Sequence, residues 1–311
     1  MKKWIAAVFA IIIFGTFFAM RLLPVQAEKI ASPNSLYMIF AGDIMLDRNV
    51  FLSSMADHNN FEPPFLLIAP ELTHYDVRVA NLEGPITDAA FNAKRAHAMS
   101  FTFNPKFAPE LVKHFDVVSL ANNHTYNFQQ AGLDSTKKYL VASGVQYFGD
   151  PLNRKDGAAW IVEKNGFKIA FVGYHAFSQP EKISVPIISD VIRDMKTRAD
   201  FVIVMPHWGV EYAPKQSRAQ IAAGHAFIDA GADAVIGGHP HVVEPMELYK
   251  GKPIYYSLGN FIFDQYFSKE TMQGEMVSVV LTRDADGKIS PQFSIVPFKI
   301  NKASQPYIES P

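Results

Sequence analysis

Short apolar runs rich in β-branched and aromatic residues recur along the chain, and each ends within a few residues at a polar side chain. Five runs have the length and composition of buried strands: residues 37–41, 77–80, 115–120, 201–205 and 234–236. Segments with the apolar spacing of helices lie between them, at residues 105–114, 129–143 and 214–230. Turn sequences predict hairpins around residues 164–166, 250–251 and 284–287. The pattern alone predicts an α/β fold with added hairpins.

The polar residues that follow the predicted strands are of kinds that bind metals or transfer protons. In chain order they are Asp43, Glu83, Asn122, Asn123, His124, His207, His239 and His241. Any one of them is explained equally well as a helix cap or a turn residue. However, all five strands deliver such a residue to the carboxyl edge, where open α/β sheets place their sites. This repetition favours one shared functional site.

The His239-Pro240-His241 segment that follows the last of these runs is the most informative stretch. Proline fixes its own φ and biases the preceding residue away from the helical region, so we expect His239 to be extended. Residues two apart in an extended segment face the same side, so both imidazoles should point together. Neutral imidazole is a good ligand for zinc, iron and manganese, and the segment therefore predicts a metal site.

Six motifs lie at residues 42–46, 81–83, 122–124, 207–212, 238–241 and 257–264. Taken in order, they resemble the CapA family, which is associated with bacterial poly-γ-glutamate capsule synthesis, and the likeness covers roughly residues 36–265. That family is similar to the calcineurin-like metallophosphoesterase superfamily. The resemblance implies an α/β fold of four layers, an αββα sandwich, with hairpins toward the C-terminus.

The resemblance also implies a site for two metal ions that share one bridging carboxylate. One ion position would have Asp43, Glu83 and His241, and the other would have Glu83, Asn123, His207 and His239. The wider superfamily has a histidine where this chain has Met45, and a thioether is a poor ligand for a hard divalent ion. The first position should therefore be the weaker, and we expect one or two divalent ions of Mn, Fe or Zn.

Further residues receive roles in substrate binding and proton transfer. The resemblance has His124 facing substrate, which makes it the candidate general acid. The candidates for supporting a ligand or contacting substrate are Arg48, Asn81, Asn122, His175 and Glu211. Arg48 would neutralise an anionic substrate and Glu211 would bond a ligand histidine, although a surface salt bridge explains either residue equally well.

The N-terminus predicts export. Two lysines precede an apolar stretch at residues 4–20, and a Val-x-Ala sequence ends at Ala27. This arrangement is typical of a secretory signal peptide cleaved after Ala27, or of an uncleaved membrane anchor. Either places the remainder outside the cytoplasm. The expected organisation is therefore a signal at residues 1–27, a linker at 28–35, a CapA-like domain at 36–300 and a tail at 301–311.

Composition limits the possible chemistry. The chain has no cysteine, which excludes disulfides, thiolate metal sites and a lipoprotein anchor. The net charge is −1, and loss of Lys2, Lys3 and Arg21 with the signal leaves −4, so we expect no nucleic-acid partner.

Two functions of different classes follow. One is a metal-dependent hydrolase that acts outside the membrane on a phosphoester or on an amide, with an anionic polymer or a phosphoester as the expected substrate. The other is a non-catalytic component that grips the polymer beside membrane-bound capsule synthesis proteins, with a structural metal site. Met45 favours the second function, whereas retention of His124 favours the first.

Overall fold

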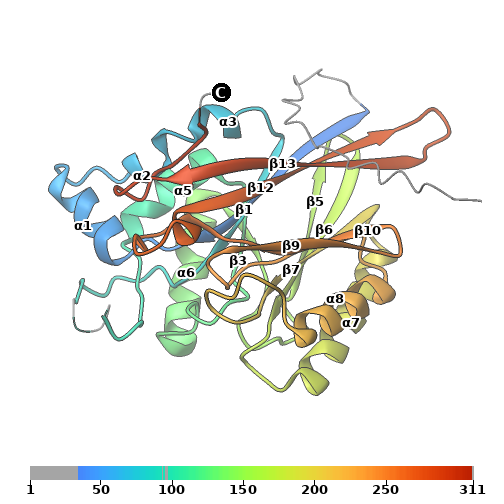
Figure 1. Ribbon diagram of the computed structural model, residues 1–311, viewed down its shortest axis with the longest axis horizontal. Helices are drawn as coiled ribbons and strands as arrows, with labels where there is room; N and C mark the ends of the chain where they lie inside the picture. Colours follow the sequence, from blue (N-terminus) through green and yellow to red (C-terminus); the bar gives the residue numbers. More distant parts are fainter. Residues whose placement is uncertain (1–33, 93, 95–96, 310–311) are drawn as a thin grey trace, which may run out of the picture.

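Two β-sheets packed face to face form the middle of the molecule, and helices cover the outer face of each (Figure 1). The computed structural model describes residues 34–309 apart from 93, 95 and 96. The expected signal or anchor at residues 1–27 and nearly all of the expected linker lie outside the described residues.

The first sheet combines parallel strands on one side with antiparallel strands on the other. β1 (Ser35–Ile44) pairs in parallel with β2 and with the short β11, whereas β12 and β13 form a long antiparallel hairpin beside it. The other strands of this sheet are β2 (Val77–Leu82), β3 (Val117–Ser119), β4 (Gln146–Phe148), β11 (Asn260–Ile262), β12 (Gln273–Arg283), β13 (Ile289–Ile300) and β14 (Pro306–Tyr307).

The second sheet has the order β5-β6-β7-β8-β10-β9, in which the four middle strands are parallel. Its edges are the outer strands of two hairpins, as the turn sequences predicted. The strands are β5 (Ala159–Lys164), β6 (Phe167–His175), β7 (Phe201–His207), β8 (Ala234–Ile236), β9 (Val243–Tyr249) and β10 (Lys252–Leu258).

Helices form the two outer layers. The first sheet is covered by α1 (Arg48–Ala56), α2 (Pro63–Leu66), α3 (Ala69–Leu72), η1 (Pro105–Phe107), α5 (Ala108–His114) and α6 (Gln129–Ser143). The second is covered by α7 (Glu181–Lys196) and α8 (Arg218–Ala230), and η2 (Glu270–Met272) precedes β12. Three separate apolar cores lie between these four layers, which confirms the predicted αββα architecture.

Alternation along β1 shows how the sequence builds two cores at once. Met38 and Phe40 face the second sheet, whereas Ile39 and Ala41 face the helices. A strand buried on both faces reads as a continuous apolar run, as this one does. At its end Gly42 lets the backbone of β11 approach, because a Cβ there would lie 1.9 Å from the carbonyl oxygen of Gly259.

The structure corrects several predicted boundaries. The helix predicted at residues 214–230 begins at Arg218, because the Ser217 hydroxyl and the Gln220 amide form a capping box. Helix α7, which contains Pro186, was not predicted. The expected tail contributes β14, which pairs with β13, and β1 begins one residue inside the expected linker.

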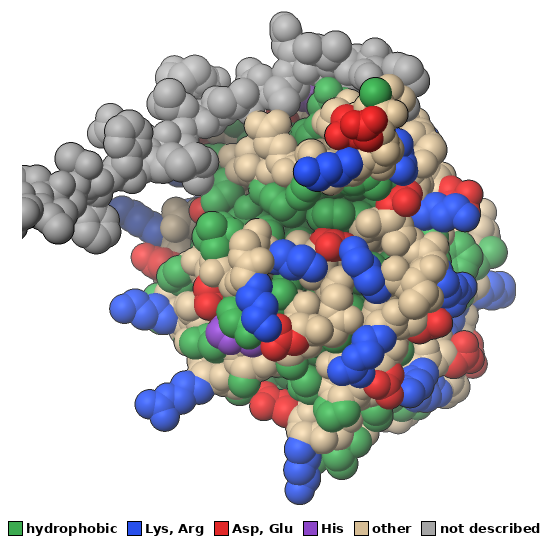
Figure 2. All heavy atoms as spheres, turned by 90° about the vertical axis from the view of Figure 1, so that its right-hand side faces the viewer, with side chains coloured by type: hydrophobic (Ala, Val, Ile, Leu, Met, Phe, Trp, Pro, Cys, Tyr) green, Lys and Arg blue, Asp and Glu red, His purple; other side chains and the backbone are tan. Residues whose placement is uncertain are grey.

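None of the described helices is both long enough and apolar enough to cross a membrane. On the face seen in Figure 2, basic and acidic side chains are interspersed rather than segregated by sign.

Candidate metal centre

The polar residues predicted to gather at the strand ends lie together, and they come from both sheets. Asp43 is near the end of β1 and Glu83 follows β2, whereas His207 ends β7. The loop after β8 carries His239 and His241. All five side chains are buried. The sequence suggested a site at the edge of one sheet, whereas the structure places the site at the junction of the two sheets.

Two groups of ligand-type atoms form within this cluster. Glu83, His207 and His239 each offer an atom within 4.8 Å of the others, and so do Asp43, Glu83 and His241. Glu83 belongs to both groups: its Oε1 lies 3.7 Å from His207 Nε2 and 4.0 Å from His241 Nε2. The carboxylate is thus placed between the two groups, as a bridging ligand requires.

Glu83 is the least satisfied group of the cluster. It is fully buried, and neither of its carboxylate oxygens has a hydrogen-bond partner among the described residues. Burial, followed by the negative charge of Asp43, raises the pKa of Glu83 well above its usual value. A buried carboxylate without donors is costly unless a cation compensates it. The surroundings of Glu83 therefore fit a divalent ion.

The three histidines present neutral rings. Burial lowers the pKa of His239 and of His241 to about 3, and that of His207 well below its ordinary value. His239 Nδ1 lies 3.2 Å from His207 Nε2, which is itself 2.9 Å from Asn123 Oδ1. Nitrogen and oxygen atoms that converge in this way suit an ion of the Mn, Fe or Zn type.

The expectation that His239 is extended is wrong, because its φ is +96°. Its backbone N–H donates to Asp43 Oδ2 at 3.0 Å, and this bond holds the turn against the bias from Pro240. Gly238 permits the approach, since a Cβ there would lie 2.6 Å from Asp43 Oδ1. The His239 and His241 rings still face one region, with centroids 5.9 Å apart.

Met45 contributes nothing to this cluster. Its side chain is fully buried in the core between the first sheet and the helices, and its sulfur accepts a hydrogen bond from the Asp47 N–H at 3.1 Å. The group around Asp43 therefore has one candidate ligand fewer than the group around His207, which includes Asn123.

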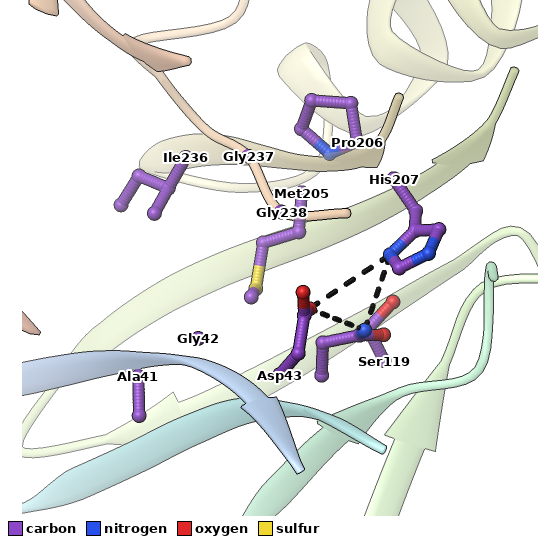
Figure 3. A pocket seen from close by; sticks show the side chains of 11 residues that line it. Ala41, Gly42, Asp43, Ser119, Met205, Pro206, His207, Ile236, Gly237 and Gly238 are labelled. Carbon is purple, nitrogen blue, oxygen red and sulfur yellow. Dashed lines mark hydrogen bonds and ion pairs between the residues drawn. The ribbon is translucent and has the colours of Figure 1, made fainter. Parts of the chain in front are cut away.

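Two buried asparagines orient the acidic end of the site. Asn122 Oδ1 accepts from the N–H groups of His124 and Thr125, at 3.1 and 2.8 Å, so its amide nitrogen must face Asn81 Oδ1. Asn81 in turn donates to Asp43 Oδ1 at 2.8 Å. Figure 3 shows Asp43 and His207 facing each other beside a small cavity between the sheets. Asn81 and Asn122 thus position Asp43.

His124 lies beside the cluster. Its Nε2 is 3.8 Å from Glu83 Oε1, and its Nδ1 is 3.2 Å from Asn127 Oδ1. The Phe101 ring packs on it at 4.3 Å, and burial lowers the pKa of His124 to about 4. The ring is therefore fixed, with one nitrogen directed toward the bridging carboxylate.

The remaining candidates surround this cluster. Arg48 forms an ion pair with Asp264 and lies over the rings of Phe101 and Phe263, and its charge lowers the pKa of Glu83. His175 Nδ1 contacts the Pro151 carbonyl at 2.7 Å, while its buried Nε2 has no partner among the described residues.

Glu211 is exposed, and within the described residues no hydrogen bond joins it to a candidate ligand histidine, so it does not bond one directly as expected. Asn260 was assigned no role from the sequence. It is the first residue of β11 and belongs to the last of the six motifs, and its Oδ1 lies 2.9 Å from His241 Nδ1. This contact and its pairing opposite Asp43 place Asn260 in the site.

The sequence pattern of one family, described as bacterial capsule synthesis protein PGA_cap, matches residues 37–265. The chain belongs to this PGA_cap family. It is 30% identical over 296 residues to the PGA biosynthesis protein CapA of Bacillus subtilis, covering 89% of this chain and 74% of that protein. It is 31% identical over 314 residues to the capsule biosynthesis protein CapA of Bacillus anthracis, covering 95% and 75%. The predicted family is therefore confirmed.

A protein from Mycoplasma pneumoniae described as a novel phosphatase has a TM-score of 0.49 and 15% identity, covering 85% of this PGA_cap chain and 94% of its own.

Proposed function

We propose that this PGA_cap protein is a metal-dependent hydrolase that acts on an anionic substrate during capsule synthesis. One observation carries the proposal: Glu83 is buried, without hydrogen bonds from described residues, between two groups of candidate ligands. The ligands would be Asp43, Glu83, Asn123, His207, His239 and His241. When bound, one or two divalent ions would supply Lewis-acid polarisation of the bond that breaks.

Two side chains would transfer the proton to the leaving group and bind the negative charge of the substrate. His124 would exchange a proton with the leaving group through Nε2, because its Nδ1 faces Asn127 Oδ1, which already accepts from the Phe101 N–H at 2.8 Å. Arg48 would attract the anionic substrate, since its charge already reaches Glu83 and it lies over two aromatic rings.

The names of the relatives support the proposed substrate, and the N-terminal sequence supports the proposed location. The relatives are named for PGA and capsule biosynthesis, which supports an anionic polymer as substrate and capsule synthesis proteins at the membrane as partners. The apolar stretch at residues 4–20 and the sequence ending at Ala27 support a place outside the cytoplasm.

A second candidate function has its own observation in its favour. Met45 is committed to the core, so the group around Asp43 offers only three protein ligands. A weakly held ion suits a structural or polymer-binding role, in which the protein assists synthesis without cleaving anything.

Metal analysis combined with hydrolysis separates these functions. The purified full-length chain should retain zinc, manganese or iron after dialysis, and should hydrolyse nitrophenyl phosphate or poly-γ-glutamate. Glu83→Gln should lose both properties. Retained metal without turnover on either substrate would favour the non-catalytic function, and a chain that binds no metal would refute both forms of the proposal.

A further inference from the structure

The ring of His241 lies between the two carboxylates, and its position alone does not decide which nitrogen faces an ion. Its Nδ1 is 3.7 Å from Asp43 Oδ2, and its Nε2 is 4.0 Å from Glu83 Oε1. A neutral imidazole carries its proton on one nitrogen and can offer only the other to a metal. The hydrogen bond that the ring makes on its far side therefore decides the matter.

Asn260 supplies that bond, and its orientation is fixed by its neighbours. Its amide nitrogen donates to Gln265 Oε1 and to the Thr271 carbonyl oxygen, both at 3.0 Å. Its oxygen must therefore face His241 Nδ1, which lies 2.9 Å away. Because an amide oxygen only accepts, His241 must donate. The ring proton is consequently on Nδ1.

The series of hydrogen bonds that begins at His241 continues through Gln265 to the surface, and its donors all point the same way. Gln265 uses its oxygen to accept from Asn260, and its amide nitrogen donates to the Tyr212 hydroxyl at 3.1 Å. Next to Tyr212 in the chain lies the exposed Glu211, whose negative charge, after the larger effect of burial, raises the pKa of the Tyr212 hydroxyl. Every donor of the series points from His241 outward, and the negative charge of Glu211 lies near its far end.

The segment that carries this chain is held in place. The Thr271 hydroxyl donates to the Gln265 carbonyl oxygen at 2.7 Å, and Asn260 and Gln265 are both buried. Tyr212 has a left-handed φ of +62°, and its N–H donates to the Pro240 carbonyl oxygen at 2.8 Å. Its ring lies 5.9 Å from that of His241. The segment of Asn260 and the loop of Tyr212 are thus both hydrogen-bonded to the His239-Pro240-His241 segment.

We propose that the directed series of hydrogen bonds from His241 through Asn260 and Gln265 to Tyr212 fixes the ring proton on Nδ1 and thereby assigns Nε2 as the metal-binding atom. The proposal rests on the metal centre of the proposed function. Asn260 and Gln265 are then positioning residues, and Glu211 at the surface strengthens the donor–acceptor series. Partners of this kind, on the far side of a ligand histidine, fix its tautomer and raise its basicity.

The tautomer can be measured without any metal. Full-length protein with ¹⁵N-labelled histidine would be stripped of metal, and long-range ¹H–¹⁵N correlations would report which His241 nitrogen carries the proton. Zinc affinity would be measured by competition with a chromophoric chelator. The variants are Asn260→Leu, Gln265→Leu and Tyr212→Phe. The control is Tyr266→Phe, because the Tyr266 hydroxyl contacts Ser304 and takes no part in this series of hydrogen bonds.

We expect the proton on Nδ1 in the wild type and in the control. Asn260→Leu should move proton density to Nε2 and weaken zinc binding by about 10- to 100-fold. Gln265→Leu and Tyr212→Phe should shift both readouts in the same direction by smaller amounts. These two variants keep the test decisive if Asn260→Leu fails to fold, because Tyr212→Phe removes a single oxygen from a partly exposed side chain.

The failures of the two proposals are distinguishable. Zinc binding with the wild-type proton on Nε2 would overturn the assignment of Nε2 and leave the metal centre standing. If the tautomer and the zinc affinity are unchanged in all three variants, the proposed role of the hydrogen-bond series is overturned, and the metal centre again stands. A wild type with the proton on Nδ1 that binds no zinc would overturn the metal centre, and with it the role of Nε2 as a ligand.

Discussion

Replacement of Glu83 by glutamine should stabilise the metal-free protein and weaken its response to metal. The wild-type carboxylate is fully buried, and its oxygens have no hydrogen bonds within the part of the chain that the structure describes. Glutamine has nearly the same shape and no charge. It therefore removes the cost of an uncompensated buried charge without breaking any described hydrogen bond.

The expected gain in the free energy of unfolding is about 2 kcal/mol near pH 8, because a buried ionised carboxylate without partners costs several kcal/mol, whereas a buried amide without partners costs about 1–3 kcal/mol. In a chain of this size that corresponds to a rise of about 3 °C in Tm. Zinc should reverse the order of the two proteins. A ligand at 100 times its Kd adds about 2.7 kcal/mol to the wild type, whereas the variant should gain far less.

The effect should depend on pH with a definite sign. The pKa of Glu83 is raised in the folded state, so the folded protein holds the proton more tightly than the unfolded chain. The metal-free wild type therefore loses stability relative to the variant as pH rises above the ordinary glutamate pKa of about 4.3. The difference in Tm should accordingly be smaller at pH 5 than at pH 8.

Scanning calorimetry with and without zinc measures these quantities. Glu244→Gln is the matched control: Glu244 is also buried, and burial raises its pKa to about 7, but it accepts from Gln220 at 2.6 Å and lies outside the cluster. That variant should respond to zinc as the wild type does. If metal-free Glu83→Gln is less stable than the wild type, or if zinc stabilises both equally, the reasoning is refuted.

Three further outcomes are expected. His239→Ala should lose more metal on dialysis than Asp43→Ala, because its group has the additional ligand Asn123; equal metal content in both variants and the wild type, by elemental analysis, would mean that neither residue is a ligand. His124→Ala should lower turnover by about 10²–10⁴-fold on substrates with poor leaving groups while metal content stays near wild type, and unchanged turnover would reject the assigned acid. Mature protein should begin at Glu28 by N-terminal sequencing, whereas an intact N-terminus in carbonate-resistant membranes would indicate an anchor.

The strands could be predicted because their causes are local, whereas the four layers and the ligand set were implied by the resemblance to a family. Runs such as that of β1 are apolar on both faces, which is typical of a strand between two cores. Helix α6 lies at the predicted residues because its apolar spacing ends at Gly144, which has a left-handed φ of +90°.

The parts that could not be predicted depend on contacts between distant segments. The turn at His239 is set by a hydrogen bond to Asp43, 196 positions away, which overrides the local bias from proline. The role of Asn260 depends on its pairing opposite Asp43 and on Gln265 and Thr271, which fix its amide. The spacing of residues along the sequence does not predict such contacts.

The division of the cluster between two sheets has a mechanical consequence. Asp43 and Glu83 are carried by strands of the first sheet, and His207, His239 and His241 by the second. The apolar layer between the sheets resists separation, but it is non-directional and opposes sliding only weakly. An ion bound by ligands from both sheets would resist sliding of one sheet past the other. Amide hydrogens in β2 and β8, two strands that never pair with each other, should then become slower to exchange in step as zinc is added.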